Sequence, residues 1–236
     1  MPVITVSGGP GSGAREIARA LATALELDYV DQEILVEAAR ELGVSVSAVA
    51  NHDERASSIG ERLSSMMLTL MERSAAAGTA DPLSGGGLEM ILARTYGEAA
   101  DLPSDAPRGQ LDDESYLRTL TSVIRGVQAR GDVVIRGRGS QAILQQEPGS
   151  VHVYVTAPKE HRIAGLVERD GMSRQDAERR IKQSDEQRRV FHQRYFKLDA
   201  ENPRLYDLTI NAGRVSHELA VRLIVKVVRE RVPRPG

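Results

Sequence analysis

The chain has 236 residues, a formal net charge of −2 and no cysteine. This length fits one large domain or a core with an insertion, and the lack of cysteine excludes disulfides, thiolate metal sites and cysteine nucleophiles. The near-neutral charge, an aromatic content of only 3% and the absence of a long apolar run argue against a nucleic acid polymer or a membrane as partner.

The first half of the chain begins with an alternation of strands and helices. Val3–Ser7 is an apolar run typical of a buried strand, and no basic segment precedes it, so we expect no secretory signal and a cytoplasmic location. Apolar residues then recur at helical spacing over 17–25, a short strand follows over 27–30, and a helix over 33–42 ends at Gly43.

The alternation resumes after residue 111. We expect strands over 133–135, 151–155 and 207–210, a short helix near 142–144, and helices that begin near Asp113, Pro158, Ser173 and Ser216. Five strands alternating with helices imply a parallel sheet covered on both faces.

We therefore expect a core formed by 1–44 and 111–236 and a helical, substrate-binding type of insertion over 45–110. The insertion contains two Gly/Pro-rich stretches that read as mobile loops. A Met-rich stripe within 59–71 is typical of core packing and is also a candidate homodimer face.

A glycine-rich loop follows the first strand. It consists of Gly8, Gly9, Pro10, Gly11, Ser12 and Gly13, between a strand and a helix. Glycines let backbone N–H groups turn toward an anion, and the helix N-terminus adds the positive end of its dipole. Four glycines in six residues exceed what a tight turn needs, so we predict a phosphate site.

The loop lacks two groups of the full pattern G-x-x-x-x-G-K-[ST]. Gly8 and Gly13 fit, but Ala14 stands where the lysine belongs, and Arg15 and Glu16 follow. In that pattern the lysine binds the β- and γ-phosphates and the hydroxyl binds magnesium. Arg15 is a candidate replacement, although a helix turn of ~100° per residue aims it elsewhere and a solvated arginine is the alternative.

A second nucleotide pattern overlaps this loop. Gly9-x-Gly11-x-x-Ala14 matches the dinucleotide fingerprint, and Asp31 lies about 20 residues on, where an acid would bind a ribose. A nicotinamide-dependent oxidoreductase is therefore an alternative. The arginine-rich range 159–194 and the lack of a recognisable Tyr-Lys or His-Asp arrangement count against it.

Four segments resemble the cytidylate kinase-like family, relatives of bacterial cytidylate kinase among the P-loop nucleoside monophosphate kinases. They are Gly-Ser-Gly-Ala-Arg-Glu-Ile (11–17), which is similar to the family's lysine-free loop, Tyr-Val-Asp-Gln-Glu-Ile (29–34), Val-Val-Ile-Arg-Gly-Arg-Gly (133–139) and the lid with its following helix (173–189). Residues 45–110 align poorly with the family.

The resemblance implies a fold and a reaction. The fold is α/β, a P-loop kinase-type parallel five-stranded sheet with helices on both faces, a helical insertion and a lid within about 168–180. The reaction is ATP-dependent phosphorylation of a nucleoside monophosphate, with Mg²⁺ bridging the phosphates. Such enzymes position their reactants in line and use arginines to neutralise the transferring phosphoryl group.

Five further residues are candidates for the site. Arg138 ends an apolar strand between two glycines, where open α/β sheets bind ligands; a surface turn is the alternative. Arg188 lies on the apolar row of its helix and must meet an anion or a buried acid. The resemblance makes Asp185 a contact to the substrate ribose or base, and a helix partner of Arg188 is the alternative. It also implies that lid arginines, here Arg169 and Arg174, reach the ATP phosphates.

Two positions depart from the active members of that family. Arg136 stands where cytidylate kinases have an acid, and Glu37 where they have an arginine for the substrate phosphate. Asp31 remains the acid placed to hold magnesium or its waters, with a helix N-cap as the alternative. Most other basic residues of 159–194, including Arg162 and Arg180, are expected on solvated helix faces. The histidines show no metal-ligand spacing and are assigned no chemistry.

The sequence thus favours a nucleoside monophosphate kinase that binds ATP and a nucleotide acceptor. A nucleotide-binding regulatory protein without turnover is the second interpretation, because losing one group that stabilises developing charge costs about 2.7–4 kcal/mol of barrier.

Overall fold

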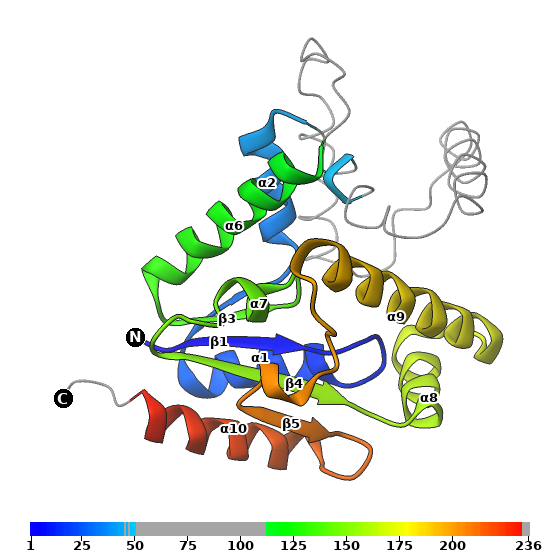
Figure 1. The fold of residues 1–236 in the computed structure, drawn as a ribbon. Coiled ribbons are helices and arrows are strands. Elements are labelled where there is room, and N and C mark those ends of the chain that lie inside the picture. The colour runs from blue at the N-terminus through cyan, green and yellow to red at the C-terminus, as the bar shows by residue number, and fades with distance from the viewer. Residues whose placement is uncertain (45, 47, 51–111, 233–236) are drawn as a thin grey trace, which may run out of the picture.

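A computed structural model of the chain describes residues 1–44, 46, 48–50 and 112–232. Its elements (Figure 1) are β1 (Val3–Ser7), α1 (Ala14–Leu25), β2 (Asp28–Val30), α2 (Glu33–Leu42), α6 (Asp113–Arg130), β3 (Val133–Arg136), α7 (Ser140–Ile143), β4 (Ser150–Thr156), α8 (Lys159–Asp170), α9 (Arg174–Phe196), the 3₁₀ turn η1 (Pro203–Leu205), β5 (Leu208–Asn211) and α10 (His217–Arg231). The insertion predicted over 45–110, with its Met-rich stripe and two loops, lies almost wholly outside the described residues.

All five strands form one parallel sheet in the order β2-β3-β1-β4-β5. β1 lies between β3 and β4, and every one of its residues is buried, as expected for a strand with neighbours on both sides and helices on both faces. The predicted α/β class with a parallel five-stranded sheet is confirmed.

The strand order contradicts the dinucleotide alternative. In a Rossmann sheet, whose order is 3-2-1-4-5-6, the second strand lies beside the first, so the acid at its end reaches the ribose of a ligand on the first loop. Here β3 separates β2 from β1. The sheet therefore does not have the Rossmann order on which the oxidoreductase interpretation depends, and that interpretation is contradicted.

Helices cover both faces of the sheet with separate cores. On one face α1 and α10 pack together, and Ile17, Leu21 and Ile224 are fully buried against strand residues such as Val153. On the other face α2 and α6 pack against β3, where Tyr116 is fully buried (Figure 1).

Three predicted helix boundaries hold because the capping residues at these helix ends fix them. The Ser173 hydroxyl accepts from the backbone N–H of Asp176 at 3.1 Å and starts α9, and Ser216 caps α10 in the same way. Gly43 ends α2 with a left-handed φ of 64°. These caps confirm three boundaries expected from the sequence.

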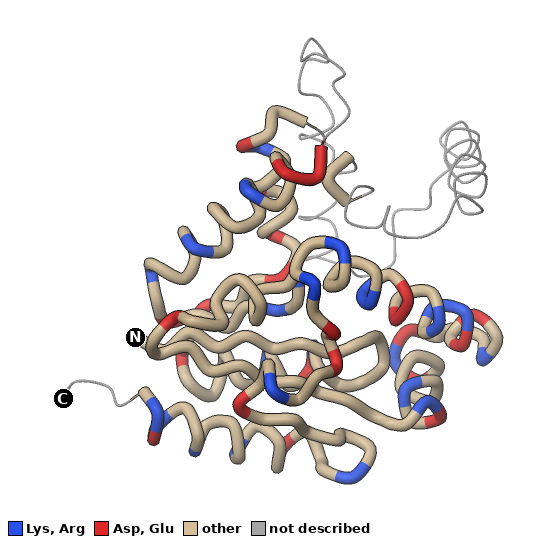
Figure 2. The backbone as a smooth tube through the Cα atoms, in the orientation of Figure 1, with Lys and Arg blue, Asp and Glu red and all other residues tan. Residues whose placement is uncertain are grey.

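Helices α8 and α9 form a hairpin at the carboxyl edge of the sheet, toward which the arrowheads of β1 and β4 point (Figure 1). A small core of Ile163, Leu166, Ala177 and Ile181 holds the two helices together. Figure 2 shows Lys and Arg interspersed with Asp and Glu along both helices. Within the described parts of the chain, no helix combines the length and apolar character needed to cross a membrane.

The two-sided core yields a stability test on neighbouring residues of α10. Ile224 is fully buried, whereas Leu223 is 43% exposed. We expect Ile224→Ala to lower the free energy of unfolding by about 2–5 kcal/mol, because it leaves a cavity between α10 and α1. Leu223→Ala, the matched control, is expected to change it by at most about 0.5 kcal/mol. Urea denaturation measures both, and equal losses would contradict this packing.

Candidate functional site

The glycine-rich loop of residues 8–13 lies at the carboxyl end of β1 and leads directly into α1. Gly11 and Gly13 adopt left-handed φ values of 72° and 82°. Gly13 caps α1 without a side chain, so the helix presents its backbone N–H groups and the positive end of its dipole at the loop. This local geometry suits an anion, as the sequence predicted.

Two glycines of the loop approach neighbouring atoms so closely that a side chain is excluded at each. A Cβ on Gly11 would overlap the carbonyl oxygen of Arg162, and a Cβ on Gly13 would overlap the His217 ring. The loop is therefore held between α8 and the start of α10. Its glycines are needed for this packing as well as for their backbone conformation.

Arg162 of α8 fastens the loop to α9, contrary to the expectation that it is solvated. Its Nε donates to the carbonyl oxygen of Pro10 at 2.8 Å, and its two terminal nitrogens bind the Asp185 carboxylate at 2.8 and 2.7 Å. The side chain is only 13% exposed. Asp185 is thus the partner of Arg162 and not of Arg188, which corrects the predicted helix pair.

A cavity of about 380 Å³ opens beside the loop. Two acids, Glu16 and Asp170, line it with six arginines, which are Arg15, Arg136, Arg138, Arg169, Arg180 and Arg188. The lining therefore carries a formal surplus of four positive charges next to a helix N-terminus. A multiply charged anion is the kind of ligand that such a lining attracts.

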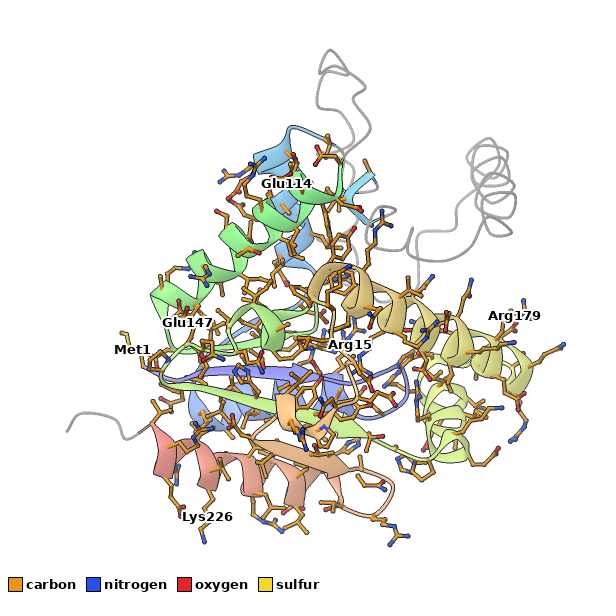
Figure 3. The ribbon with its side chains drawn as sticks, viewed as in Figure 1. Met1, Arg15, Glu114, Glu147, Arg179 and Lys226 are labelled. Atoms are coloured by element: carbon orange, nitrogen blue, oxygen red, sulfur yellow. The ribbon has the colours of Figure 1, made fainter. Side chains whose placement is uncertain are left out.

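The structure brings Arg15 and Arg169 to this cavity but not Arg174. Arg169 binds Glu16 and Asp170. Arg174 is 62% exposed and pairs with Glu160 and Glu178, away from the loop. Arg180, expected on a solvated face, instead lines the cavity and lies 3.6 Å from Asp170. Figure 3 shows Arg15 near the centre of the molecule, in contrast to Arg179 at the outer end of α9.

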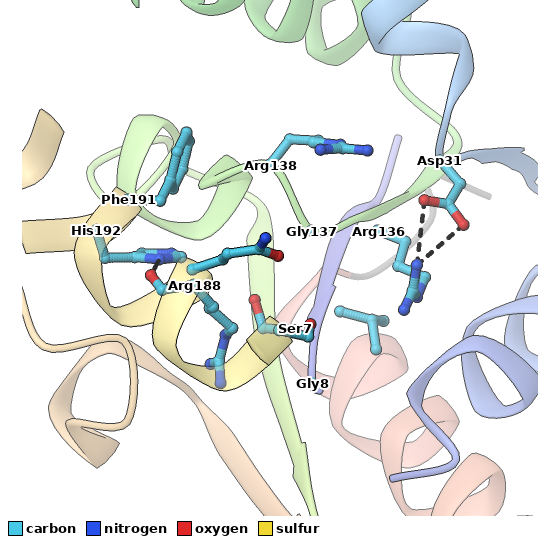
Figure 4. Close-up of a pocket in the computed structure, with 12 residues that line it drawn as sticks. Ser7, Gly8, Asp31, Arg136, Gly137, Arg138, Arg188, Phe191 and His192 are labelled. Atoms are coloured by element: carbon cyan, nitrogen blue, oxygen red, sulfur yellow. Dashed lines mark hydrogen bonds and ion pairs between the residues drawn. The ribbon is translucent and has the colours of Figure 1, made fainter. Parts of the chain in front are cut away.

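Asp31 is buried, and two guanidinium groups lie near its carboxylate; Figure 4 shows its contact with Arg136. One terminal nitrogen of Arg136 lies 3.2 and 3.1 Å from its two oxygens, and Arg15 lies 3.6 Å away. The Tyr29 hydroxyl donates to the same carboxylate at 3.0 Å; burial and the Asp31 charge raise the pKa of Tyr29 to about 12. The N-cap of α2 is Gln32, so the N-cap alternative for Asp31 is wrong.

These contacts bear on the predicted magnesium role of Asp31. Its carboxylate is already neutralised by Arg136, and Arg15 follows Ala14 where a magnesium-binding hydroxyl would stand. Among the described residues no three His, Asp or Glu side chains gather as a metal site. The described residues therefore offer no protein cage for a metal ion, and the magnesium role of Asp31 stays a prediction.

Arg138 and Arg188 line both this cavity and a second one of about 250 Å³. Arg138 has a left-handed φ of 57° and is half-buried; burial lowers the pKa of its guanidinium. Arg188 donates to the carbonyl oxygen of Ala200 at 3.0 Å and lies over the Tyr154 ring. The expected buried acid is absent from these contacts, since Glu201, 3.9 Å away, is 68% exposed.

A buried hydrogen-bond chain links the end of β1 to α9. Ser7 donates to Gln141 at 3.1 Å, the Gln141 amide nitrogen lies 2.7 Å from His192 Nε2, and His192 Nδ1 lies 2.8 Å from the carbonyl oxygen of Arg188. Since a carbonyl only accepts, Nδ1 carries the proton and Nε2 accepts from the amide. Burial lowers the pKa of His192 to about 4, so the ring is neutral at pH 7.

Sequence reasoning missed Arg162, Gln141 and His192 as members of the site. Arg162 lies in a strongly charged helix. The only feature that distinguishes it from solvated arginines in the sequence is its position in the first turn after Pro158. His192 directly follows Phe191 on the predicted inward part of α9, which was a usable signal of burial. Gln141 carried no signal, because its partners lie 134 and 51 residues away in sequence.

The close approach at Gly11 gives a prediction with a matched control. Gly43 is also left-handed, at 64°, but a Cβ there would meet nothing within 4 Å among the described residues. We expect Gly43→Ala to lower the free energy of unfolding by about 1–2 kcal/mol. Gly11→Ala should cost about 1–3 kcal/mol more, because it also displaces Arg162. Equal losses in denaturation would show that the loop is not wedged against α8.

The buried neutral His192 predicts an acid-dependent loss of stability. The unfolded histidine binds a proton near pH 6.5, whereas the folded one does so only near pH 4. Between these values stability falls with falling pH, by a total of about 2–3 kcal/mol. His192→Gln should lose this part of the pH dependence in urea titrations from pH 7 to pH 4.5, while buried His152 still contributes in both proteins. An unchanged pH profile would contradict the assignment.

A family model described as the cytidylate kinase-like family matches residues 3–214. A cytidylate kinase of Ignicoccus hospitalis is 24% identical over 229 residues, which cover 97% of this chain and 99% of that protein. An uncharacterized protein from Eubacterium ventriosum has a similar structure, with a TM-score of 0.61, 18% identity and coverage of 98% of this chain and 100% of that one.

These findings confirm the resemblance on which the expected fold rests. The family match spans the glycine-rich loop, both arginine-lined cavities and all five strands. It confirms the P-loop kinase-type α/β fold and supports a kinase-like phosphotransferase that uses nucleotides. The chain belongs to the cytidylate kinase-like family.

Proposed function

We propose that this protein transfers a phosphoryl group from ATP to a nucleoside monophosphate, in the manner of a cytidylate kinase. The observation that carries the proposal is the position of the glycine-rich loop, which faces a cavity lined by six arginines at the carboxyl edge of the sheet. Phosphoryl transfer needs little besides positioning and charge neutralisation, and this edge offers both.

The ATP phosphates occupy the loop in this proposal. Residues 8–15 contribute backbone N–H groups and the start of α1, and Arg169 approaches from the end of α8. Its acid partners Glu16 and Asp170 hold it at the cavity wall. A polyphosphate would compete with these acids for the guanidinium, since phosphate oxygens bind arginine in the same bidentate way as carboxylates.

The acceptor occupies the second cavity. The two cavities share Gly8, Arg136, Arg138, Ser184, Gln187 and Arg188, so ligands in them would meet end to end. This arrangement suits in-line attack on a terminal phosphate. Arg138 and Arg188 are proposed to hold the acceptor phosphate. The similarity to a protein named cytidylate kinase makes a cytidine monophosphate the first acceptor to test.

A regulatory protein that binds nucleotides without turnover is the second candidate. Ala14 removes the loop lysine, and Arg136 neutralises the acid that would otherwise face the metal. Both changes lower the charge stabilisation available in a transition state and leave ground-state binding of phosphates in place.

Coupled ADP release separates the two candidates. With ATP and Mg²⁺ we expect turnover on at least one nucleoside monophosphate of a panel that begins with CMP. Gly11→Asp should lower that turnover by about 100-fold or more, because it places a clashing carboxylate in the anion site. Lack of turnover above Gly11→Asp, with ATP binding intact by calorimetry, would favour the regulator. Lack of both turnover and ATP binding would overturn the proposed function.

A further inference from the structure

The lysine missing from the glycine-rich loop leaves open which cation faces the donor phosphates. Most arginines near the loop have other partners. Arg162 is fastened to Asp185 and Pro10, and Arg169 reaches the phosphates only by exchanging its two acid partners, Glu16 and Asp170. Arg15 is 42% exposed, so its charge is screened by solvent.

Arg136 enters the site from a different direction. It is the last residue of β3, in register with Val6 of β1, and the next residue, Gly137, donates its backbone N–H to the Val6 carbonyl oxygen at 3.1 Å. The side chain therefore starts beside the strand that carries the loop. It lines both cavities together with Gly8, and the larger of them together with Ala14.

The charges around Arg136 are unbalanced in favour of the cation. Asp31 is shared by Arg136 and Arg15, so two guanidiniums face one carboxylate. Only one terminal nitrogen of Arg136 binds Asp31 (Figure 4). Its Nε is buried and has no hydrogen-bond partner among the described residues. A buried unsatisfied donor is unfavourable, and an anionic ligand at this position would satisfy it.

We propose that Arg136 supplies, from the end of β3, the donor-phosphate-binding cation that Ala14 cannot supply from the loop. The inference rests on the proposed function and assigns one residue within it. Asp31 then serves as a positioning residue that orients the Arg136 guanidinium. This role explains why the Asp31 carboxylate is already paired with an arginine. In this proposal the positive charge comes from the end of β3, whereas in the usual pattern it comes from a lysine in the first turn of α1.

The test is the dissociation constant for ATP, measured by calorimetry without added metal. Arg136→Gln keeps a hydrogen-bond donor toward Asp31 and should weaken ATP binding about 10- to 100-fold, the effect of losing one charged hydrogen-bond donor. Arg222→Ala, an exposed arginine on α10 paired with Glu218, removes the same charge far from the cavities and should leave binding unchanged.

A second substitution makes the assignment specific. Ala14→Lys restores the loop lysine, and Ala14→Lys with Arg136→Gln should bind ATP within about threefold of the unmodified protein. In the unmodified background Ala14→Lys should add little, because Arg136 already fills that role. Circular dichroism and thermal melting confirm that each variant is folded.

The outcomes are distinguishable. ATP affinity of Arg136→Gln within about twofold of the unmodified protein would overturn the inference and leave the proposed function standing. An equal gain from Ala14→Lys in both backgrounds would also overturn it, because independent effects mean that lysine does not replace Arg136. Failure of the unmodified protein to bind ATP would overturn both.

Discussion

The wedged position of the glycine-rich loop is the constraint on which the rest of the site depends. Gly11 lies against the backbone of α8, Gly13 against His217 at the start of α10, and Arg162 ties Pro10 to Asp185 of α9. A loop held on these sides cannot rearrange without moving two helices. Its backbone N–H groups are therefore pre-organised, which lowers the entropy that a ligand must lose on binding.

The same packing explains how so many arginines are tolerated at one edge. Most of them are paired with acids or carbonyl groups from a neighbouring element, as Arg169 is with Glu16 and Arg188 with Ala200. Paired charges cost less to bury than unpaired ones. A phosphate ligand then exchanges partners with these acids, so binding need not create a buried charge.

Much of the fold could be predicted because its signals are local. Apolar runs marked the strands, Ser173 and Ser216 fixed the starts of two helices, and Gly43 ended another. The position of the glycine-rich loop also follows from its immediate neighbours. Such features depend on a few adjacent residues and need no knowledge of the sheet order.

The partners within the site could not be predicted, because tertiary packing creates them. Asp31 and Arg136 are 105 residues apart and meet because β2 and β3 are adjacent parallel strands whose carboxyl ends lie at the same edge of the sheet. The same holds for Arg162 and Asp185, which meet where α8 and α9 turn back on each other. A sequence pattern identifies each residue type, but not whether a carboxylate will face a metal ion, a ribose or an arginine.

The central claim is that this edge of the sheet binds nucleotides through their phosphates. The most direct measurement is calorimetric affinity for ATP, ADP, AMP and adenosine at one ionic strength. The account predicts that affinity falls with each phosphate removed, by about tenfold for a terminal phosphate that contacts an arginine. Equal affinity for ATP and adenosine, or saturable NADH binding that ATP does not displace, would contradict it.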